Sequence, residues 1–467
     1  MHKTTTFVQN KKKNTNLKFY IMKKIFSCIV LAAMAVSSFA GGLLTNTNQS
    51  AAFVRNPMRY ASLETDAIYF NPAGTAFFNE GWSMSVNWQM IWQDRDVLST
   101  KFLGQPNNKE YKGSVYVPCM PTIHAAYKTG NWTFSGFFGM PGGGGNAKFE
   151  DGLPMFDALG TGSLASMGMA GKSAFESTQY LFALQLGAAY KINDNWSVYG
   201  GLRTNYTSLS YEGAINAVHP QAGNQGEFLA LELTQSGIAF APIIGVDYKV
   251  GKFNFAAKYE FRAVNIIEND TKELSSQLLA QQLGGNANLD GKIGALSQAV
   301  PALATLASLQ DGEKFRNDAP ALLSIAASYD ITDRWTVMGG YTYYFDKDAK
   351  IQSLIGKANT MKTLSRNTFE LLGGIEFKAT EKLLFSAGVQ FSDFGVNSSY
   401  LSDVSFIDDS FTTGLGAKYS FNENWDLNVG VCYANYAHGK GVNASTYSES
   451  KYLRKTYNVA VGVDFRF

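Results

Sequence analysis

One short stretch of this chain has the residue types of a phosphate-binding loop. Gly171-Lys172-Ser173 matches the end of the loop that cradles nucleotide phosphates with its backbone N–H groups. The full motif also needs an earlier glycine, but that position is Ser166, and no buried strand precedes it. The sequence therefore predicts neither a nucleotide site nor a step driven by ATP.

A second stretch resembles the first half of a calcium-binding loop. Asn286, Asn288 and Asp290 alternate in front of Gly291, as oxygen ligands do in such loops. The twelfth position should be a bidentate Glu and is Ser297 instead. We therefore expect no metal and no other cofactor.

Hydrolytic chemistry would need a nucleophile beside a histidine. After residue 40 the histidines are His124, His219 and His438, on three separate segments, and no Gly-x-Ser-x-Gly motif occurs. The sequence predicts a protein that is not an enzyme. An enzyme acting on lipids, with Ser and His from neighbouring strands, stays open as an alternative.

The elements that would position such groups are marked by a recurring turn. Each copy has an aromatic residue, a few polar turn formers and then a bulky apolar residue, usually Trp. This pattern is typical of a tight β-hairpin. The copies lie at 127–132, 190–196, 248–253, 329–335, 377–383 and 419–425.

The segments flanking each turn alternate between two kinds of residue. Leu184 and Leu186 share one parity, whereas Gln185 and Gly187 occupy the other. A strand with this pattern has one apolar face and one small or polar face. The aromatics stand where each apolar face meets its turn, as in the girdle of a transmembrane barrel, which favours that fold over a soluble sandwich.

Fourteen strands of this kind follow residue 80, joined alternately by short turns and longer links. This arrangement predicts an all-β fold, a 14-stranded antiparallel transmembrane β-barrel over 81–467, with long extracellular loops at 141–178 and 268–319. The predicted strands are 82–94, 113–128, 132–140, 179–192, 196–211, 237–250, 253–267, 320–331, 335–346, 367–378, 383–393, 410–421, 425–436 and 455–467.

Residues 1–40 have the features of a targeting segment. Met22-Lys23-Lys24 starts a basic region, a largely apolar run follows, and Ser38-Phe39-Ala40 fits a signal-peptidase site. We expect a signal peptide with an upstream extension, translation starting at Met22. Without its seven Lys, the 40 basic and 38 acidic residues become 33 and 38, a net charge near −5. That balance gives no reason to expect a nucleic-acid partner.

Two motifs before the first strand carry a resemblance to a known family. They are Thr45-Asn-Thr-Asn-Gln-Ser-Ala-Ala-Phe53 and Asp66-Ala-Ile-Tyr-Phe-Asn-Pro-Ala-Gly74, followed by fourteen strands and a terminal Phe467. With them the chain resembles the FadL/TodX family of outer-membrane transporters for long-chain fatty acids and other hydrophobic compounds. The likeness spans the whole chain after residue 40.

The resemblance implies two features of the fold. Residues 41–80, with the motif Asn71, Pro72, Ala73 and Gly74, would form an N-terminal hatch that plugs the lumen. A kink in the third strand would open a lateral gate through which an apolar substrate enters the membrane. The sequence offers Gly139, Pro141 and Gly142, Gly143, Gly144 and Gly145 for that kink. The alternative is that Pro141 merely ends the strand at the outer rim.

A fatty-acid carboxylate would need a cationic or amide partner in an otherwise apolar pocket. The substrate-binding candidates are aromatic or cationic residues of the implied hatch and of the inward strand faces. They are Phe53, Arg55, Arg59, Phe70, Arg203, Lys258 and Arg262. For each cation taken singly, pairing with a neighbouring acid is the competing interpretation.

The resemblance and the apolar strand faces together predict a function. We expect passive transport of a hydrophobic small molecule across the outer membrane of a Gram-negative bacterium, by a monomer in contact with outer-membrane lipids. A general porin for hydrophilic solutes is the alternative. The substrate could be a fatty acid, an aromatic hydrocarbon or another lipid.

Overall fold

The computed structural model describes residues 44–278, 280, 288–293, 306–354, 357–404, 406–443 and 447–467. The expected signal peptide at 1–40 lies outside these residues, as do Asn286 and Ser297 of the calcium-like stretch. Gly144 and Ser166 are described through their backbone only.

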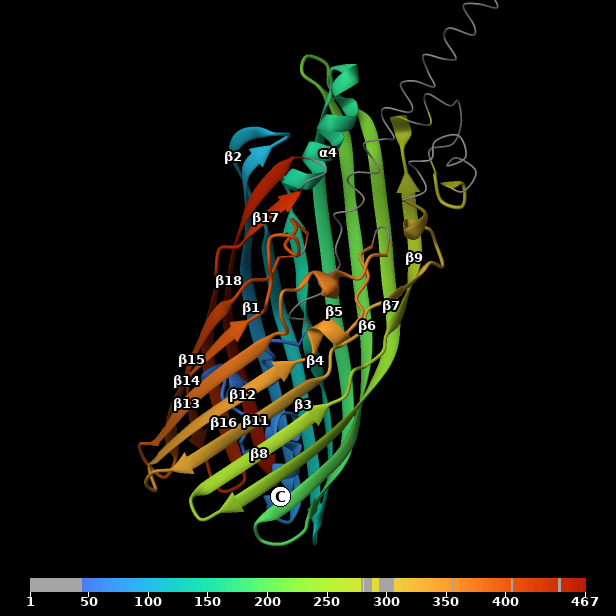
Figure 1. Ribbon diagram of the computed structural model, residues 1–467. Coiled ribbons are helices and arrows are strands. Elements are labelled where there is room, and N and C mark those ends of the chain that lie inside the picture. The colour runs from blue at the N-terminus through green and yellow to red at the C-terminus, as the bar shows by residue number, and fades with distance from the viewer. Residues whose placement is uncertain are drawn as a thin grey trace, which may run out of the picture.

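Fourteen antiparallel strands of the described chain close into a barrel, as the sequence predicts (Figure 1). The ring closes where β1 pairs with β18, from Ser83 opposite Arg466 to Lys101 opposite Glu449. The crossing strands are β1 (Gly81–Phe102), β3 (Ser114–Thr129), β4 (Trp132–Phe149), β5 (Ala170–Lys191), β6 (Trp196–His219), β7 (Gly223–Val250), β8 (Phe253–Glu260), β11 (Leu322–Asp330), β12 (Trp335–Tyr344), β13 (Phe369–Lys378), β14 (Leu383–Asp393), β15 (Ser410–Ser420), β16 (Trp425–Tyr436) and β18 (Ser448–Arg466).

Shorter elements lie mostly at the end of the barrel that carries the long connections, which we call the loop end. The other end, with the short hairpins and the C-terminus, is the turn end (Figure 1). The short strands are β2 (Gln105–Tyr111), β9 (Ile266–Ser275), β10 (Lys314–Arg316) and β17 (Lys440–Asn443), and the loop helices are α4 (Pro154–Leu164), η2 (Ala165–Met167), η4 (Asp346–Asp348) and η5 (Thr360–Thr363).

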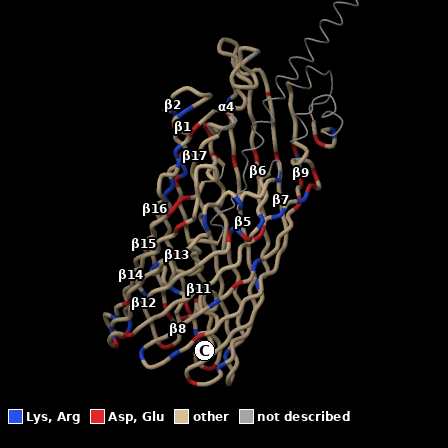
Figure 2. The backbone as a smooth tube through the Cα atoms, viewed as in Figure 1, with Lys and Arg blue, Asp and Glu red and all other residues tan. Residues whose placement is uncertain are grey.

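The two faces of each strand meet opposite environments. On β5, Leu184 and Leu186 are 47% and 57% exposed, whereas Gln185 between them is 1% exposed. A soluble sandwich would bury the leucines and expose the glutamine. The apolar parity therefore faces lipid and the polar parity lines the interior. Charged residues lie at both ends of the barrel and at several positions between them, whereas long stretches of the strands carry none (Figure 2).

Aromatic pairs across neighbouring strands form a girdle at the turn end. Ring centroids lie 4.3 Å apart in Trp196–Tyr248 and 4.4 Å apart in Trp335–Phe377. A second belt includes the Trp92–Tyr116 pair, 5.8 Å apart. Trp92 lies ten positions after Trp82 on β1, which is about 25 Å of height for a tilted strand and matches the apolar band of an outer-membrane barrel.

Several strands run further than predicted, so the barrel wall is higher on one side than on the other. β4 continues to Phe149 and β5 begins at Ala170, so the loop predicted at 141–178 shrinks to 150–169. The loop predicted at 268–319 likewise contains most of β9 and all of β10. Figure 1 shows β5, β6 and β7 rising with α4 above the shorter strands β11 to β16. Above the membrane both strand faces can be polar, so the alternation that reveals a strand is lost.

An N-terminal segment, residues 44–80, lies inside the barrel (Figure 1). It holds α2 (Ala51–Arg55), α3 (Ala67–Phe70) and η1 (Pro72–Phe77). Ser50 caps α2 by accepting a hydrogen bond from the Phe53 N–H, and the Asn71 side chain caps η1 at Gly74 N–H. Among the described residues, no helix is both long and apolar enough to cross a membrane.

Glycines on the inner wall make room for α2 and the residues after it. A Cβ built on Gly430 would lie 2.5 Å from Arg55 N, and one on Gly374 or Gly388 would lie 2.3 Å from Asn56 Oδ1. Real Cβ atoms do not approach that closely. We call Gly374, Gly388, Gly414 and Gly430 the glycine seam. It lets the N-terminal segment pack directly on the backbone of β13 to β16.

Candidate functional site

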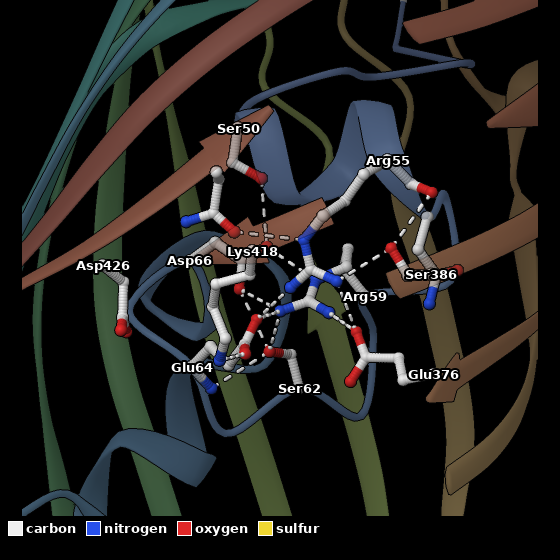
Figure 3. A network of polar contacts seen from close by, with 12 residues as sticks. Ser50, Arg55, Arg59, Ser62, Glu64, Asp66, Glu376, Ser386, Lys418 and Asp426 are labelled. Carbon is white, nitrogen blue, oxygen red and sulfur yellow. Dashed lines mark hydrogen bonds and ion pairs between the residues drawn. The ribbon is translucent and has the colours of Figure 1, made fainter. Parts of the chain in front are cut away.

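Two of the predicted cations, Arg55 and Arg59, lie in a buried ionic network at the base of the N-terminal segment (Figure 3). Arg55 contacts Glu64 at 2.8 Å and Glu376 of β13 at 2.7 Å. Arg59 contacts Asp66 at 2.8 Å and also pairs with Glu64. Lys418 of β15 completes what we call the plug network by pairing with Glu64.

Three cations thus face three carboxylates in the plug network. Burial acts to raise the pKa of Asp66, but Arg59 outweighs burial and holds that pKa below its usual range. Burial also opposes ionisation of Glu64, and Lys418, Arg59 and Arg55 together hold its pKa well below the ordinary value. The network joins the segment to the wall, and its arginines are already paired.

Arg203 and Lys258 share a second buried network, on β6 and β8. Arg203 Nη1 lies 2.6 Å from Glu260 Oε2, and Lys258 Nζ lies 2.7 Å from Glu260 Oε1. Arg203 also donates to Gln185, and Lys258 donates to Tyr69 O at 2.9 Å. Arg262 lies apart from both networks, because it is exposed at the loop end and donates to Asp348 O.

The Asn71–Gly74 motif is fastened to the opposite wall. Asn71 Nδ2 donates to Asp247 Oδ2 of β7 at 2.5 Å, and Asn254 of β8 donates to the same oxygen at 3.0 Å. Ser197 of β6 donates to Ala73 O at 2.7 Å. A side chain on Gly74 would collide with Asn71, since its Cβ would lie 2.4 Å from Nδ2. Each residue of the motif is buried.

Phe53 and Phe70 stack in parallel, with centroids 5.4 Å apart and planes 8° apart. Tyr60 and Tyr69 pack edge-on against Phe70. His124 of β3, fully buried, lies beside Phe137 with centroids 5.0 Å apart. This aromatic cluster fills the lumen below a cavity, and Phe53 forms part of the cavity floor.

A cavity of about 130 Å³ lies between the N-terminal segment and the loop end. Residues 45–48 and Phe53 form its base, and its walls come from both sides of the barrel seam at β1 and β18 and from β3 and β4. The wall residues are Ile91, Gln93, Val117, Met120, Met140, Pro141, Gly142, Gly143, Gly145, Tyr180, Ile407, Thr412, Cys432, Ala434, Tyr436, Arg454, Thr456 and Asn458.

The cavity reaches a break in the barrel wall. β3 and β4 pair at Ser114–Lys148 and Val115–Ala147, and then again only from Ile123–Phe138. Residues 116–122 of β3 have no partner on β4, and we call this stretch the β3–β4 gap. On its other side β4 pairs with β5 through register shifts at Gly139/Gly142 and Gly143/Gly145. The interpretation that Pro141 ends the strand is wrong, because β4 continues to Phe149.

Sequence reasoning overlooked two residues that produce this break. Pro118 and Pro121 lie within β3, where proline removes a ladder donor. A proline inside a predicted strand was the sequence signal that could have revealed the break in pairing. Gly143 and Gly145 have φ of +119° and +72°, which glycine adopts readily. Both edges of the gap are thus encoded by residues that disfavour regular pairing.

The stretch that resembles a phosphate loop and the stretch that resembles a calcium loop contribute hydrogen bonds within the fold. Gly171 and Ser173 lie on β5, where Ser173 Oγ donates to Asp157 Oδ1 of α4 at 2.7 Å. Asp290 Oδ1 accepts a hydrogen bond from Asp311 N. Within the described ranges, no group of three or more His, Cys, Asp or Glu side chains could hold a metal ion.

Comparisons with known proteins agree with this architecture. The model of the outer membrane protein β-barrel domain matches residues 274–467. None of the curated proteins compared with this sequence matches it. The chain is a β-barrel of the outer membrane, as the sequence predicts.

Three solved structures cover nearly the whole chain. A FadL homologue of Pseudomonas aeruginosa is 16% identical, with a TM-score of 0.66 over 91% of this chain and 100% of its own. The toluene transporter TodX of P. putida is 12% identical, with a TM-score of 0.58 over 92% and 99%. The toluene transporter TbuX of Ralstonia pickettii is 14% identical, with a TM-score of 0.52 over 86% and 94%. The resemblance to FadL and TodX is confirmed for the fold.

Proposed function

We propose that this outer-membrane barrel, which shares its fold with FadL and TodX, transports a hydrophobic small molecule passively. The observation that carries the proposal is the cavity whose walls include both edges of the β3–β4 gap. A molecule held there lies next to lipid without passing the N-terminal segment. The substrate would leave sideways into the outer membrane.

Capture would take place on the apolar loops at the loop end. Leu153, Met155 and Leu159 of the α4 region belong to one hydrophobic cluster with Leu401 and Phe406 of the loop before β15. Soft, apolar side chains of this kind can repack around a ligand. These residues are buried, so the proposal assigns the first contact with substrate to partly buried residues packed against them, such as Phe156 and Met167, and the tighter contact to the cavity beneath.

A buried carboxylate connects two parts of the loop cluster. The Asp403 carboxylate accepts hydrogen bonds from Met155 N at 2.7 Å and from Tyr452 OH at 2.9 Å. It thereby joins α4 to β18. Separating these elements would open the way from the loops to the cavity.

Residues 44–80 would act as the hatch. Its part from Ala51 onward packs on the glycine seam and holds the plug network, so it is anchored to the wall. Residues 45–48 form the base of the cavity and precede these anchors. If the substrate binds more tightly after residues 45–48 have moved, its binding would favour that displaced conformation. In this proposal residues 45–48 move when substrate binds, whereas the hatch from Ala51 onward stays anchored to the wall.

The remaining expectations are parts of the same proposal. A signal peptide ending at Ala40 would direct export from the cytoplasm of a Gram-negative bacterium, and the barrel would act as a monomer. Arg55, Arg59, Arg203 and Lys258 are assigned to holding the hatch and wall together. The paired state of these residues supports that assignment over substrate binding.

The test compares this proposal with a general porin and with a lipid-acting enzyme. Cells with and without the protein are given toluene, a long-chain fatty acid and a small sugar, and uptake is measured. We expect faster uptake of at least one hydrophobic compound, no change for the sugar, near-zero conductance in planar bilayers and no lipid hydrolysis. High conductance with sugar uptake would favour the porin, and released fatty acid the enzyme.

A further inference from the structure

The barrel wall breaks a second time, between β7 and the strands β8 and β9 that follow it. The ladder of β7 with β8 ends at Ile243–Glu260, and the ladder of β7 with β9 begins at Ser236–Glu268. In the described chain, residues 237–241 have ladder partners on β6 but none on β8 or β9. We call this stretch the β7 break. β8 lies toward the turn end and β9 toward the loop end (Figure 1).

Residues at both ends of the β7 break disfavour regular pairing. Pro242 has no N–H to donate, and its carbonyl accepts a hydrogen bond from Phe261 N at 2.9 Å at the edge of the break. At the other end, a Cβ built on Gly237 would lie 2.3 Å from Ile266 O. Beyond Phe261 the chain pairs with residues 317–319 instead of β7. The β7 break is therefore encoded in the sequence, as the β3–β4 gap is.

The outer side of the β7 break faces lipid. Ile238, Phe240 and Val264, on the two edges of the break, are apolar and exposed. Ile238 lies ten positions before Tyr248 of the turn-end girdle, which is the separation of the two aromatic belts on β1. The break is therefore at the level of the second belt, inside the apolar band. Four strands, β4 to β7, separate it from the β3–β4 gap.

The inner side of the β7 break is covered by small and apolar side chains. Leu44 shares one buried cluster with Ala239 and Ala241 of β7 and with Ala263 on the other edge of the break. Because alanine side chains are small, Leu44 supplies much of this cover. Residues 45–48, which follow Leu44 directly, form the base of the cavity. The start of the N-terminal segment thus lies between the cavity and the β7 break.

Three buried amides beside this cluster lack hydrogen-bond donors. Asn205 of β6 opposes Ala239, and Asn317 N donates to Asn265 O at 2.9 Å on the other edge of the break. The Oδ1 atoms of these three asparagines are buried and accept no hydrogen bond in the described part of the chain. A buried acceptor without a donor is costly, so these oxygens favour a ligand that brings one. A neutral hydroxyl can donate to them, whereas a hydrocarbon and a carboxylate cannot.

We propose that the β7 break is a second lateral gate, for hydrophobic molecules that carry a neutral hydroxyl group. Displacement of residues 45–48 by substrate withdraws Leu44 from the cluster. The hydroxyl group then donates to the amides of Asn205, Asn265 and Asn317, while the apolar part passes between the two edges of the break into the membrane. Hydrocarbons have no hydroxyl to donate and leave through the β3–β4 gap. This inference rests on the proposed function and adds a second exit for a second class of substrate.

The first experiment asks whether the β7 break opens when an alcohol binds. Ala239→Cys is made in a Cys119→Ser/Cys432→Ser background, and its reaction with a hydrophobic maleimide is followed in the purified protein in a neutral detergent. We expect dodecanol to speed the reaction at least about threefold and dodecane to change it less. Leu44→Ala should speed the reaction without ligand. Ala189→Cys is the matched control and should stay unreactive, because Ala189 is buried on β5 where both neighbouring strands pair regularly.

The second experiment blocks each exit in turn. Cells carrying Ala239→Cys in the same background, or Cys432→Ser alone, are treated with the maleimide in the presence of dodecanol, and uptake of dodecanol and of dodecane is then measured. Modified Ala239→Cys protein should lose uptake of dodecanol and keep uptake of dodecane. Modification of Cys119 should have the reverse effect. Asn205→Leu/Asn265→Leu, which removes two acceptors, should slow dodecanol uptake about tenfold and leave dodecane uptake within about twofold of wild type.

The outcomes separate the second gate from the proposed function. If Ala239→Cys stays unreactive with dodecanol, or if its modification leaves dodecanol uptake unchanged, the gate is overturned and exit through the β3–β4 gap stands. Equal loss of dodecanol and dodecane uptake overturns the selection by the hydroxyl group. If wild-type protein speeds uptake of toluene but not of dodecanol, the gate fails alone, and if it speeds uptake of no hydrophobic compound, the proposed function fails as well. Ala263→Cys, on the opposite edge of the break, repeats the test should Ala239→Cys not fold.

Discussion

Asn71 of the N-terminal segment donates a 2.5 Å hydrogen bond to Asp247 on the barrel wall. The two residues are buried and far apart in sequence, so the bond ties the segment to β7. The plug network makes the matching tie on the other side, through Glu376 and Lys418. The segment is therefore held at two opposed walls, and its movement as one body would require both ties to break.

Asn71→Ala should loosen the first tie. Among the described residues, Asn254 would then be the remaining side-chain donor to the buried Asp247 carboxylate, and we expect a loss of about 1–3 kcal/mol in the free energy of unfolding. The temperature at which the folded barrel is lost in gel-mobility assays reports the change. Gln221→Ala, in an exposed loop, is the control and should leave that temperature unaltered.

Gly430→Ala should displace α2 from the glycine seam. The new methyl group would meet the backbone of the N-terminal segment, which cannot rotate away as a flexible side chain can. We expect higher planar-bilayer conductance than wild type, because a displaced segment leaves water-filled space. Gly200→Ala is the matched control, since its Cβ would meet no atom within 4 Å. Equal conductance in the two variants would contradict this role of the seam.

The plug network makes stability depend on acid pH. The pKa values of Glu64 and Asp66 are held below their ordinary values in the folded state. Their contribution is present above the unfolded pKa values, near 4.5 and 3.8, and is lost as pH falls through the lower folded values. We expect stability to drop as pH falls below about 4.

Glu64→Gln provides the comparison for that acid transition. It removes one titrating group, so the variant should be less stable at neutral pH and lose less stability on acidification. The midpoint of denaturation measured from pH 7 down to pH 3 checks both parts. A parallel loss in variant and wild type would show that other carboxylates control the transition.

Restoring backbone donors in β3 should narrow the β3–β4 gap. In a Pro118→Val/Pro121→Val variant each position regains an N–H and prefers an extended conformation. We expect slower amide exchange in residues 116–122 and slower uptake of the hydrophobic substrate. Binding to the cavity should persist, because the cavity's base and seam side are unchanged. Undiminished uptake despite slower exchange would argue against exit through the gap.

Local patterns account for what the sequence could predict. Alternation such as Leu184, Gln185 and Leu186 reveals a lipid-facing strand, and the repeated turns place the aromatic girdle. Strand extensions beyond the membrane carry no such alternation, so β4 and β5 were predicted too short. Mid-strand Pro118 and Pro121 were a readable signal of the gap.

Local sequence patterns could not predict which inward-facing side chains form ion pairs inside the barrel. Arg55 pairs with Glu376, 321 positions away, and Arg203 pairs with Glu260, 57 positions away. Parity shows that a side chain points inward but not which side chains meet it there. The sequence therefore identified a set of inward cations, whereas only the three-dimensional arrangement shows which carboxylates they meet.

The most direct measurement blocks the gap chemically. Cys119 is exposed within the part of β3 that has no partner on β4, and Cys432→Ser removes the partly buried thiol of the cavity. In cells carrying Cys432→Ser, modification by a bulky hydrophobic maleimide should abolish protein-dependent uptake of the hydrophobic substrate. The double variant Cys119→Ser/Cys432→Ser should be unaffected. Full uptake through the modified Cys119 protein would contradict lateral exit between β3 and β4.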